Sequence, residues 1–112
     1  MGEVRLCGAA EVAPGTMRRF DVAGRAVCVV RIAAADGGEG GDEWYAIGDT
    51  CSHQDYPLSD GELWVEEREV ECPKHGATFS LRTGEALTLP ATRPVPCYPV
   101  RVEGDDVWIE VP

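Results

Sequence analysis

Short apolar segments recur along the chain, and several of them alternate apolar with polar residues at a spacing of two. The segment at residues 26–32 is rich in β-branched side chains and follows a glycine. The segment at residues 68–72 places Val70 and Cys72 on one face and two glutamates on the other. The pattern predicts an all-β protein of antiparallel strands, at residues 3–7, 17–22, 26–32, 44–47, 62–65, 68–72, 100–102 and 107–111.

Two connecting segments have unusual compositions. Residues 34–42 are dominated by glycine and acidic residues, which favours a mobile hairpin tip and matches no nucleotide-binding loop. Residues 87–99 contain four prolines, so we expect this segment to cross the surface in extended form. With 112 residues in all, the pattern indicates one domain over residues 1–112.

Two short segments each offer one thiolate and one imidazole to a metal: Cys51-Ser52-His53 and Cys72-Pro73-Lys74-His75. A single zinc ion could accept all four ligands in tetrahedral geometry. Structural zinc sites usually begin with two cysteines, however, whereas each segment here is mixed. Mixed pairs suit a Rieske [2Fe–2S] cluster, in which one iron takes two cysteines and the other takes two histidines.

The chain resembles the Rieske family, and in particular its small soluble ferredoxins. The resemblance extends over nearly the whole chain and is carried by these motifs: Cys51-Ser52-His53, Pro57-Leu58-Ser59-Asp60-Gly61, Cys72-Pro73-Lys74-His75-Gly76 and Phe79-Ser80-Leu81-Arg82-Thr83-Gly84. It implies a Rieske iron-sulfur fold, with an antiparallel β base domain and a small cluster-binding subdomain at roughly residues 50–82. It also implies a third loop over the cluster at Leu89-Pro90-Ala91.

The resemblance assigns the cofactor and its ligands. One [2Fe–2S] cluster is expected per subunit, with Cys51 and Cys72 on the inner iron and His53 and His75 on the outer iron. The chain has only these two histidines, and both fall in the ligand pairs. The resemblance implies an electron-transfer protein and not an enzyme in its own right.

The implied circuit passes single electrons from an NAD(P)H-dependent flavoprotein reductase to a terminal non-haem iron oxygenase. The chain is too short to hold the mononuclear iron domain of the oxygenase itself. Two alternatives stay open at this point. One is a small Rieske-type subunit of an assimilatory nitrite reductase, and the other is a structural zinc-binding module.

Departures from the respiratory members of the family bear on the redox potential. Those members carry a disulfide between the two ligand loops, and serine and tyrosine hydroxyls that bond to the cluster and its cysteine. The matching places here hold Tyr56, Lys74, Ala77 and Phe79. Without these hydroxyl donors, we expect a potential toward the low end of the range for Rieske centres, about −150 to +300 mV.

The charge and the cysteine content narrow the classes of partner and the cellular compartment that we expect. The chain has 20 acidic and 10 basic residues, a net charge of −10, which disfavours nucleic acid and anionic membranes and favours a basic protein partner or simple solubility. We expect a cytoplasmic protein, because the start lacks a signal peptide pattern and no apolar run is long enough to span a membrane. We also expect a monomer. Cys7, Cys28 and Cys97 are expected to be buried thiols in a reducing compartment.

Overall fold

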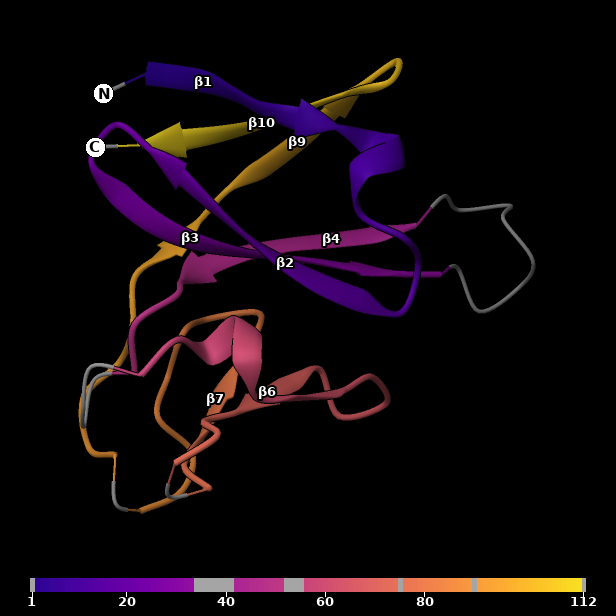
Figure 1. The fold of residues 1–112 in the computed structure, drawn as a ribbon. Coiled ribbons are helices and arrows are strands. Elements are labelled where there is room, and N and C mark those ends of the chain that lie inside the picture. Colours follow the sequence, from indigo (N-terminus) through magenta and orange to yellow (C-terminus); the bar gives the residue numbers. More distant parts are fainter. Residues whose placement is uncertain (1, 34–41, 52–55, 75, 90, 112) are drawn as a thin grey trace.

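The computed structural model describes residues 2–33, 42–51, 56–74, 76–89 and 91–111. The expected hairpin tip at 34–42 therefore falls almost wholly outside the described residues, as do His53, His75 and Pro90. The described parts form ten strands and two single-turn 3₁₀ helices, at Ala9–Glu11 and Leu58–Asp60. Figure 1 shows the fold.

The strands form three antiparallel sheets. The first sheet has the order β1 (Gly2–Gly8), β10 (Asp106–Val111), β9 (Val100–Glu103). The second has the order β2 (Thr16–Val22), β3 (Arg25–Ile32), β4 (Glu43–Gly48), β8 (Cys97–Tyr98). The third has the order β5 (Glu62–Trp64), β6 (Glu69–Glu71), β7 (Thr78–Ser80). An all-β antiparallel fold is thus confirmed.

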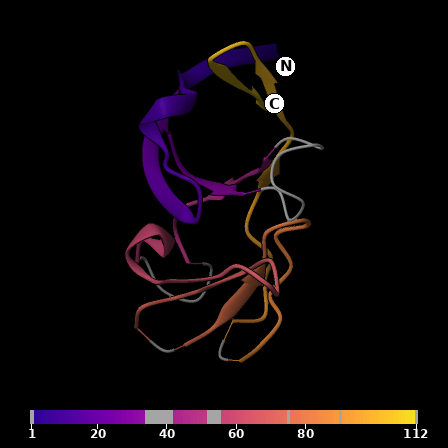
Figure 2. The ribbon, with the colours of Figure 1, turned by 90° about the vertical axis from the view of Figure 1, so that its right-hand side faces the viewer.

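The second sheet is the middle layer of the molecule, with the first sheet on one side and the third sheet with its loops on the other (Figures 1 and 2). Strand β3 shows this arrangement residue by residue. Val27 and Val29 belong to the core shared with β1 and β10, whereas Cys28, Val30 and Ile32 belong to the core shared with β6 and β7. Because successive side chains point to opposite faces, a strand between two cores needs apolar residues on both faces, as in the middle of β3.

The core beneath the third sheet is the one that bears on the metal ligands. It joins buried residues of β3 and β4 to those of β6, β7 and the connecting loops. Its fully buried members include Leu58, Val70, Phe79 and Leu81, and it also contains Cys51 and Cys72. Cys51 and Cys72 therefore lie in a packed core and not in an exposed loop.

The proline-dense segment forms little regular structure, and the expectation for one cysteine is wrong. Within residues 87–99 the only strand in the described part is the two-residue β8, at the edge of the second sheet. Cys7 and Cys28 are buried, as expected, but Cys97 is exposed. The reason is the alternation of β8, because Tyr98 takes the inward position and Cys97 must face outward.

Candidate metal centre

The first ligand loop leaves β4 and returns to the 3₁₀ helix at Leu58. Its neck is closed by a β-bridge between Thr50 and Pro57 and by the Cys51 N–H, which donates to the Tyr56 carbonyl at 2.9 Å. The Leu58 N–H donates to the Asp49 carbonyl just beyond. These bonds fix both limbs of the loop before the chain reaches the position of His53.

The second ligand loop joins β6 to β7 and is closed in the same way. The Cys72 N–H donates to the Ala77 carbonyl at 2.7 Å, so in both loops the cysteine N–H bonds to the carbonyl five residues further on. The Gly76 N–H also returns to the Cys72 carbonyl at 3.2 Å. Gly76 has φ +74°, a left-handed conformation that favours glycine, and this is a reason for the glycine that the spacing alone did not reveal.

The two cysteines are presented alike. Cys51 is 3% exposed and Cys72 is 2% exposed, both are thiols outside any disulfide, and both lie in the same core. Two buried thiols at the starts of two matched loops suit the sulfur side of a Rieske centre, because in such a centre two cysteine thiolates bind the same iron. The structure thus brings Cys51 and Cys72 into one core, while His53 and His75 lie outside the described residues.

The approach of the two loops depends on Gly61. A Cβ added at Gly61 would lie 1.8 Å from the carbonyl oxygen of Glu71, the residue that precedes Cys72. Any other side chain would therefore push the end of the first loop away from the start of the second. The motif containing Pro57 and Gly61 carries a packing requirement of the site.

A buried carboxylate ties the first loop to the second sheet. Asp49 is 1% exposed and accepts from the Ser59 N–H at 2.7 Å and from the Ser59 hydroxyl at 3.0 Å. Arg19 on β2 lies 3.8 Å from the same carboxylate. Burial raises the pKa of the Asp49 carboxyl, while the Ser59 bonds and Arg19 act in the opposite direction. We call these three residues the Asp49 clasp.

A second link joins the β5–β6 hairpin to β4. Arg68 donates from Nε to Glu43 at 3.0 Å and also bonds through its terminal nitrogen, and the Tyr45 hydroxyl donates to the same carboxylate. The Arg68 bonds, followed by the Tyr45 bond, lower the pKa of Glu43 to about 2. Arg68 itself has φ +58°, which is uncommon for a residue other than glycine. We call Arg68, Glu43 and Tyr45 the Arg68 clasp.

The sequence interpretation missed both clasps. The sequence pattern assigns no role to Asp49, and it places Arg68 only at the start of the strand at residues 68–72. An acidic residue between an apolar strand and a metal-ligand pair is the signal that could have drawn attention to Asp49. No sequence signal pointed to the left-handed backbone at Arg68.

The expected third loop passes close to the ligand core. Ala91 is buried in the core that holds Cys51 and Cys72, whereas Leu89 is 77% exposed. Pro90 lies outside the described residues. The surroundings of Ala91 agree with a loop that packs beside the candidate centre, and the covering of the cluster stays a prediction.

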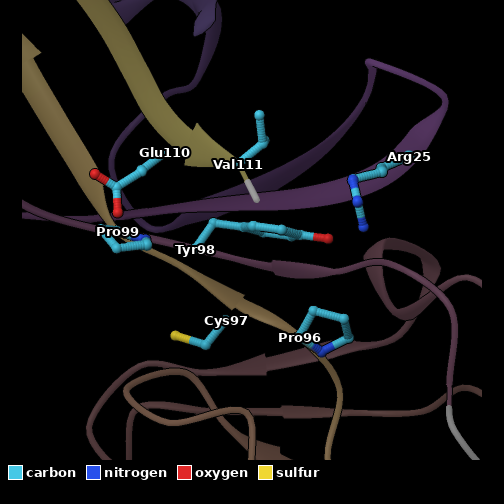
Figure 3. Close-up of a pocket in the computed structure, with 7 residues that line it drawn as sticks. All are labelled: Arg25, Pro96, Cys97, Tyr98, Pro99, Glu110 and Val111. Carbon is cyan, nitrogen blue, oxygen red and sulfur yellow. The ribbon is translucent and has the colours of Figure 1, made fainter. Parts of the chain in front are cut away.

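The first and second sheets together form what we call the base of the molecule. A separate pocket lies in this base. Figure 3 shows the Tyr98 ring at its centre, with Glu110 and Arg25 on opposite sides. Pro96, Cys97, Pro99 and Val111 complete the lining. None of these residues is a candidate ligand, so the pocket is distinct from the metal centre.

The comparisons with known proteins agree with this geometry. The sequence model of the Rieske [2Fe–2S] domain family matches residues 2–99. The chain is 40% identical over 112 residues to the 3-phenylpropionate/cinnamic acid dioxygenase ferredoxin subunit of Escherichia coli (strain K12), covering 100% of this chain and 96% of that one.

Two solved structures match with high coverage. The ferredoxin of carbazole 1,9a-dioxygenase from Nocardioides aromaticivorans IC177 has a TM-score of 0.85 and 37% identity, over 97% of each chain. A chain in the complex of reduced oxygenase and oxidized ferredoxin of carbazole 1,9a-dioxygenase has a TM-score of 0.79 and 32% identity, over 96% of this chain and 91% of that one.

The chain belongs to the Rieske [2Fe–2S] domain family. Its cofactor is a Rieske [2Fe–2S] cluster, which replaces the zinc alternative, and its role is that of an electron carrier, not of a catalyst. The cluster accepts and releases one electron at a time. Over the described residues, none of the helical segments has the length and hydrophobicity needed to cross a bilayer.

Proposed function

We propose that the chain carries electrons from an NAD(P)H-dependent flavoprotein reductase to a terminal non-haem iron oxygenase. Its cluster is held by Cys51 and Cys72 through sulfur and by His53 and His75 through nitrogen. The cluster-binding subdomain covers roughly residues 50–82 of a single domain. The carrier works as a cytoplasmic monomer that meets each partner transiently.

The observation that carries this proposal is the matched pair of loops with buried thiols. Cys51 and Cys72 lie at equivalent places in two loops closed by equivalent hydrogen bonds, and each is followed by a histidine within three residues. Such a pair can place one sulfur and one nitrogen from each loop around a two-iron cluster. The relatives described above are ferredoxin components of dioxygenases, which favours this circuit over the nitrite reductase alternative.

We call the two ligand loops and the third sheet the ligand end of the molecule. Exposed apolar side chains support docking of a partner protein there. Among the described residues, the large exposed hydrophobic side chains are Tyr56, Trp64, Leu87, Leu89 and Val102. Four of the five belong to the stretch that runs from the first ligand loop through the expected third loop: Tyr56, Trp64, Leu87 and Leu89. Apolar residues at the edge of a redox centre favour a short-lived contact with a partner.

The charge of −10 supports a basic partner surface. Charge complementarity mainly speeds association and is weakened by salt, which suits a carrier that must also leave its partner. We expect the rate of electron delivery to fall as ionic strength rises. If the rate of electron delivery did not depend on salt concentration, the negative charge of the protein would serve solubility and not partner binding.

The low-potential prediction follows from Ala77 and Phe79. Both side chains are buried next to the second ligand loop, and neither carries a hydroxyl. Hydrogen bonds to cluster sulfur stabilise the reduced state, so their absence lowers the potential. Voltammetry should give a midpoint in the lower part of the range of about −150 to +300 mV. A midpoint well above zero would contradict this prediction.

The circuit is tested by reconstitution. The purified protein is mixed with NADH, a flavoprotein reductase of an aromatic dioxygenase system and the matching terminal oxygenase, and oxidised substrate is measured. We expect turnover that depends on the amount of this protein. If the cluster is reduced by the reductase but never reoxidised by any oxygenase tested, the acceptor in this proposal is wrong.

A further inference from the structure

A cation–π contact links the two ligand loops at their exposed side. The Lys74 ammonium lies over the Tyr56 ring, with Nζ 5.5 Å from the ring centroid. Tyr56 belongs to the first loop and Lys74 to the second, between Cys72 and His75. A cation within about 6 Å of the centroid of an aromatic ring is attracted by the ring quadrupole.

The backbone holds each member of this pair in its loop. The Tyr56 carbonyl accepts the Cys51 N–H, so the backbone from which the ring projects is part of the neck of the first loop. The Gly76 N–H donates to the Cys72 carbonyl across the turn that contains Lys74. An attraction between Tyr56 and Lys74 therefore acts between the two loops and not merely within one of them.

We propose that Tyr56 and Lys74 are positioning residues that latch the two ligand loops together. The latch opposes separation of the loops, which is the motion that would release the cluster. It forms no covalent bond, so it holds in a reducing compartment and in either redox state of the cluster. The proposal rests on the proposed function, because it assumes that the two loops hold the cluster between them.

The positions of the pair strengthen this assignment. By the resemblance given above, they match the places of the disulfide that joins the two ligand loops in respiratory Rieske proteins. A covalent link between the loops is thus replaced here by a non-covalent one, made by two side chains that this chain carries at the same places. We infer that the loops need a tie at this point whatever its chemistry.

The test uses matched pairs of variants in the cluster-loaded protein. Lys74→Met removes the charge and keeps the length of the side chain, whereas Lys74→Arg keeps a cation. Tyr56→Leu removes the ring, whereas Tyr56→Phe keeps the ring and loses only the hydroxyl. The double variant Lys74→Met with Tyr56→Leu completes a double-mutant cycle.

The measurement is the rate of cluster loss. Iron released to a chromogenic chelator and the decay of visible absorbance are followed at one temperature, and far-ultraviolet circular dichroism checks that the sheets stay folded. Both side chains are exposed, so each disrupting variant should lose its cluster only about two to five times faster than the natural protein.

The pattern across variants decides the proposal. We expect Lys74→Arg and Tyr56→Phe to release iron at the natural rate, and the double variant to be no faster than the faster single variant. Additive effects of the two disrupting variants would overturn the latch, as would equal loss in the conservative variants or no change in any variant. If the natural protein never holds a coloured cluster, the proposed function fails first, and that result is distinct from these.

Discussion

The two ends of the molecule are stabilised in different ways. In the base, β2 and β3 pair over seven residues, and β1 and β10 are also long. In the ligand end, β5, β6 and β7 have three residues each. The base is thus held by regular sheet pairing, while the ligand end relies on loop necks, on two clasps and on its metal centre.

This difference shows how one small chain can combine a rigid support with a site made of loops. Among the described residues, the core between the first and second sheets contains no residue of the ligand end, so the base buries that core by itself. The ligand end needs the middle sheet as its floor. Damage to the ligand end should therefore leave the base folded, whereas damage to the base should affect both ends.

The largest effect is expected from removing a cluster ligand. Cys51→Ser, His53→Ala, Cys72→Ser and His75→Ala should each abolish or grossly deplete the cluster, because one of the two irons loses one of its two protein ligands. Visible absorbance and iron content of the purified variants measure this. Far-ultraviolet circular dichroism should still show the strands of the base.

Cys97→Ser is the matched control for these variants. Cys97 is an exposed thiol whose sulfur lies 3.5 Å from the Arg82 carbonyl, and it is no part of the ligand core. Its replacement should leave visible absorbance unchanged. Loss of the cluster in Cys97→Ser, or its retention in Cys72→Ser, would contradict the assigned ligand set.

The next largest effect separates the two cores. Phe79→Ala and Ile109→Ala each empty a fully buried position, the first in the core with the ligands and the second in the core of the base. Losses of about 3–5 and 2–5 kcal/mol respectively are expected. Thermal melts followed by visible absorbance and by circular dichroism should separate for Phe79→Ala, with the cluster lost first.

For Ile109→Ala the two signals should change together. The base supports the ligand end, so its unfolding removes the floor beneath the cluster. If the melts by visible absorbance and by circular dichroism separated in both variants, or coincided in both, the base would not fold independently of the ligand end.

The sequence predicted the strands well because their pattern is simple. The β-branched content of residues 26–32 located β3, and the alternation of residues 68–72 located β6. In both strands the residues with strand propensity and apolar side chains are also the buried ones. The outward turn of Cys97 was not predicted, because two residues are too few to show which of them faces inward.

For the site, the sequence predicts a set of ligands, which stays a prediction, and it does not predict the contacts that support the ligand loops. The spacing of Cys51, His53, Cys72 and His75 pointed to a mixed cluster, since few metals require such pairs. Most contacts of the two clasps, and the Tyr56–Lys74 contact, join residues that are at least ten positions apart in sequence. Such contacts depend on the packing of three sheets, which local pattern does not encode.

A smaller effect is expected at the Asp49 clasp. Asp49→Asn removes a buried charge that accepts two hydrogen bonds, at a cost of about 1.5–3 kcal/mol. Ser59→Ala keeps its backbone bond and should cost about 0.5–1.5 kcal/mol. Denaturant titration followed by visible absorbance gives both values.

The exposed Asp21 provides the control, because it also contacts Arg19 but lies outside the core. Asp21→Asn should change little. A cost for Ser59→Ala that exceeds the cost for Asp49→Asn would show that the carboxylate is not the centre of the clasp.

The smallest effect concerns pH at the Arg68 clasp. The pKa of Glu43 is about 2 in the folded protein, below its ordinary value of 4.5. The stabilisation is therefore complete above pH 4.5 and is lost as pH falls toward 2. Glu43→Gln should lower the melting temperature at pH 7, and the difference from the natural protein should narrow below pH 4.5.

The readout is the melting temperature of both proteins by circular dichroism from pH 7 to pH 3. Acid loss of the cluster affects both proteins, so the difference between them isolates Glu43. A difference that stays constant over this range would mean that the carboxylate charge does not act through Arg68.

We propose that the two irons are held unequally, by sulfur on one and by nitrogen on the other. Pulsed electron paramagnetic resonance of the dithionite-reduced protein gives the sharpest test, because nitrogen nuclei bound to iron modulate the signal. We expect couplings from two histidine nitrogens in the natural protein, with one lost in His53→Cys or His75→Cys if a cluster still assembles. A reduced cluster without directly bound nitrogen would contradict it.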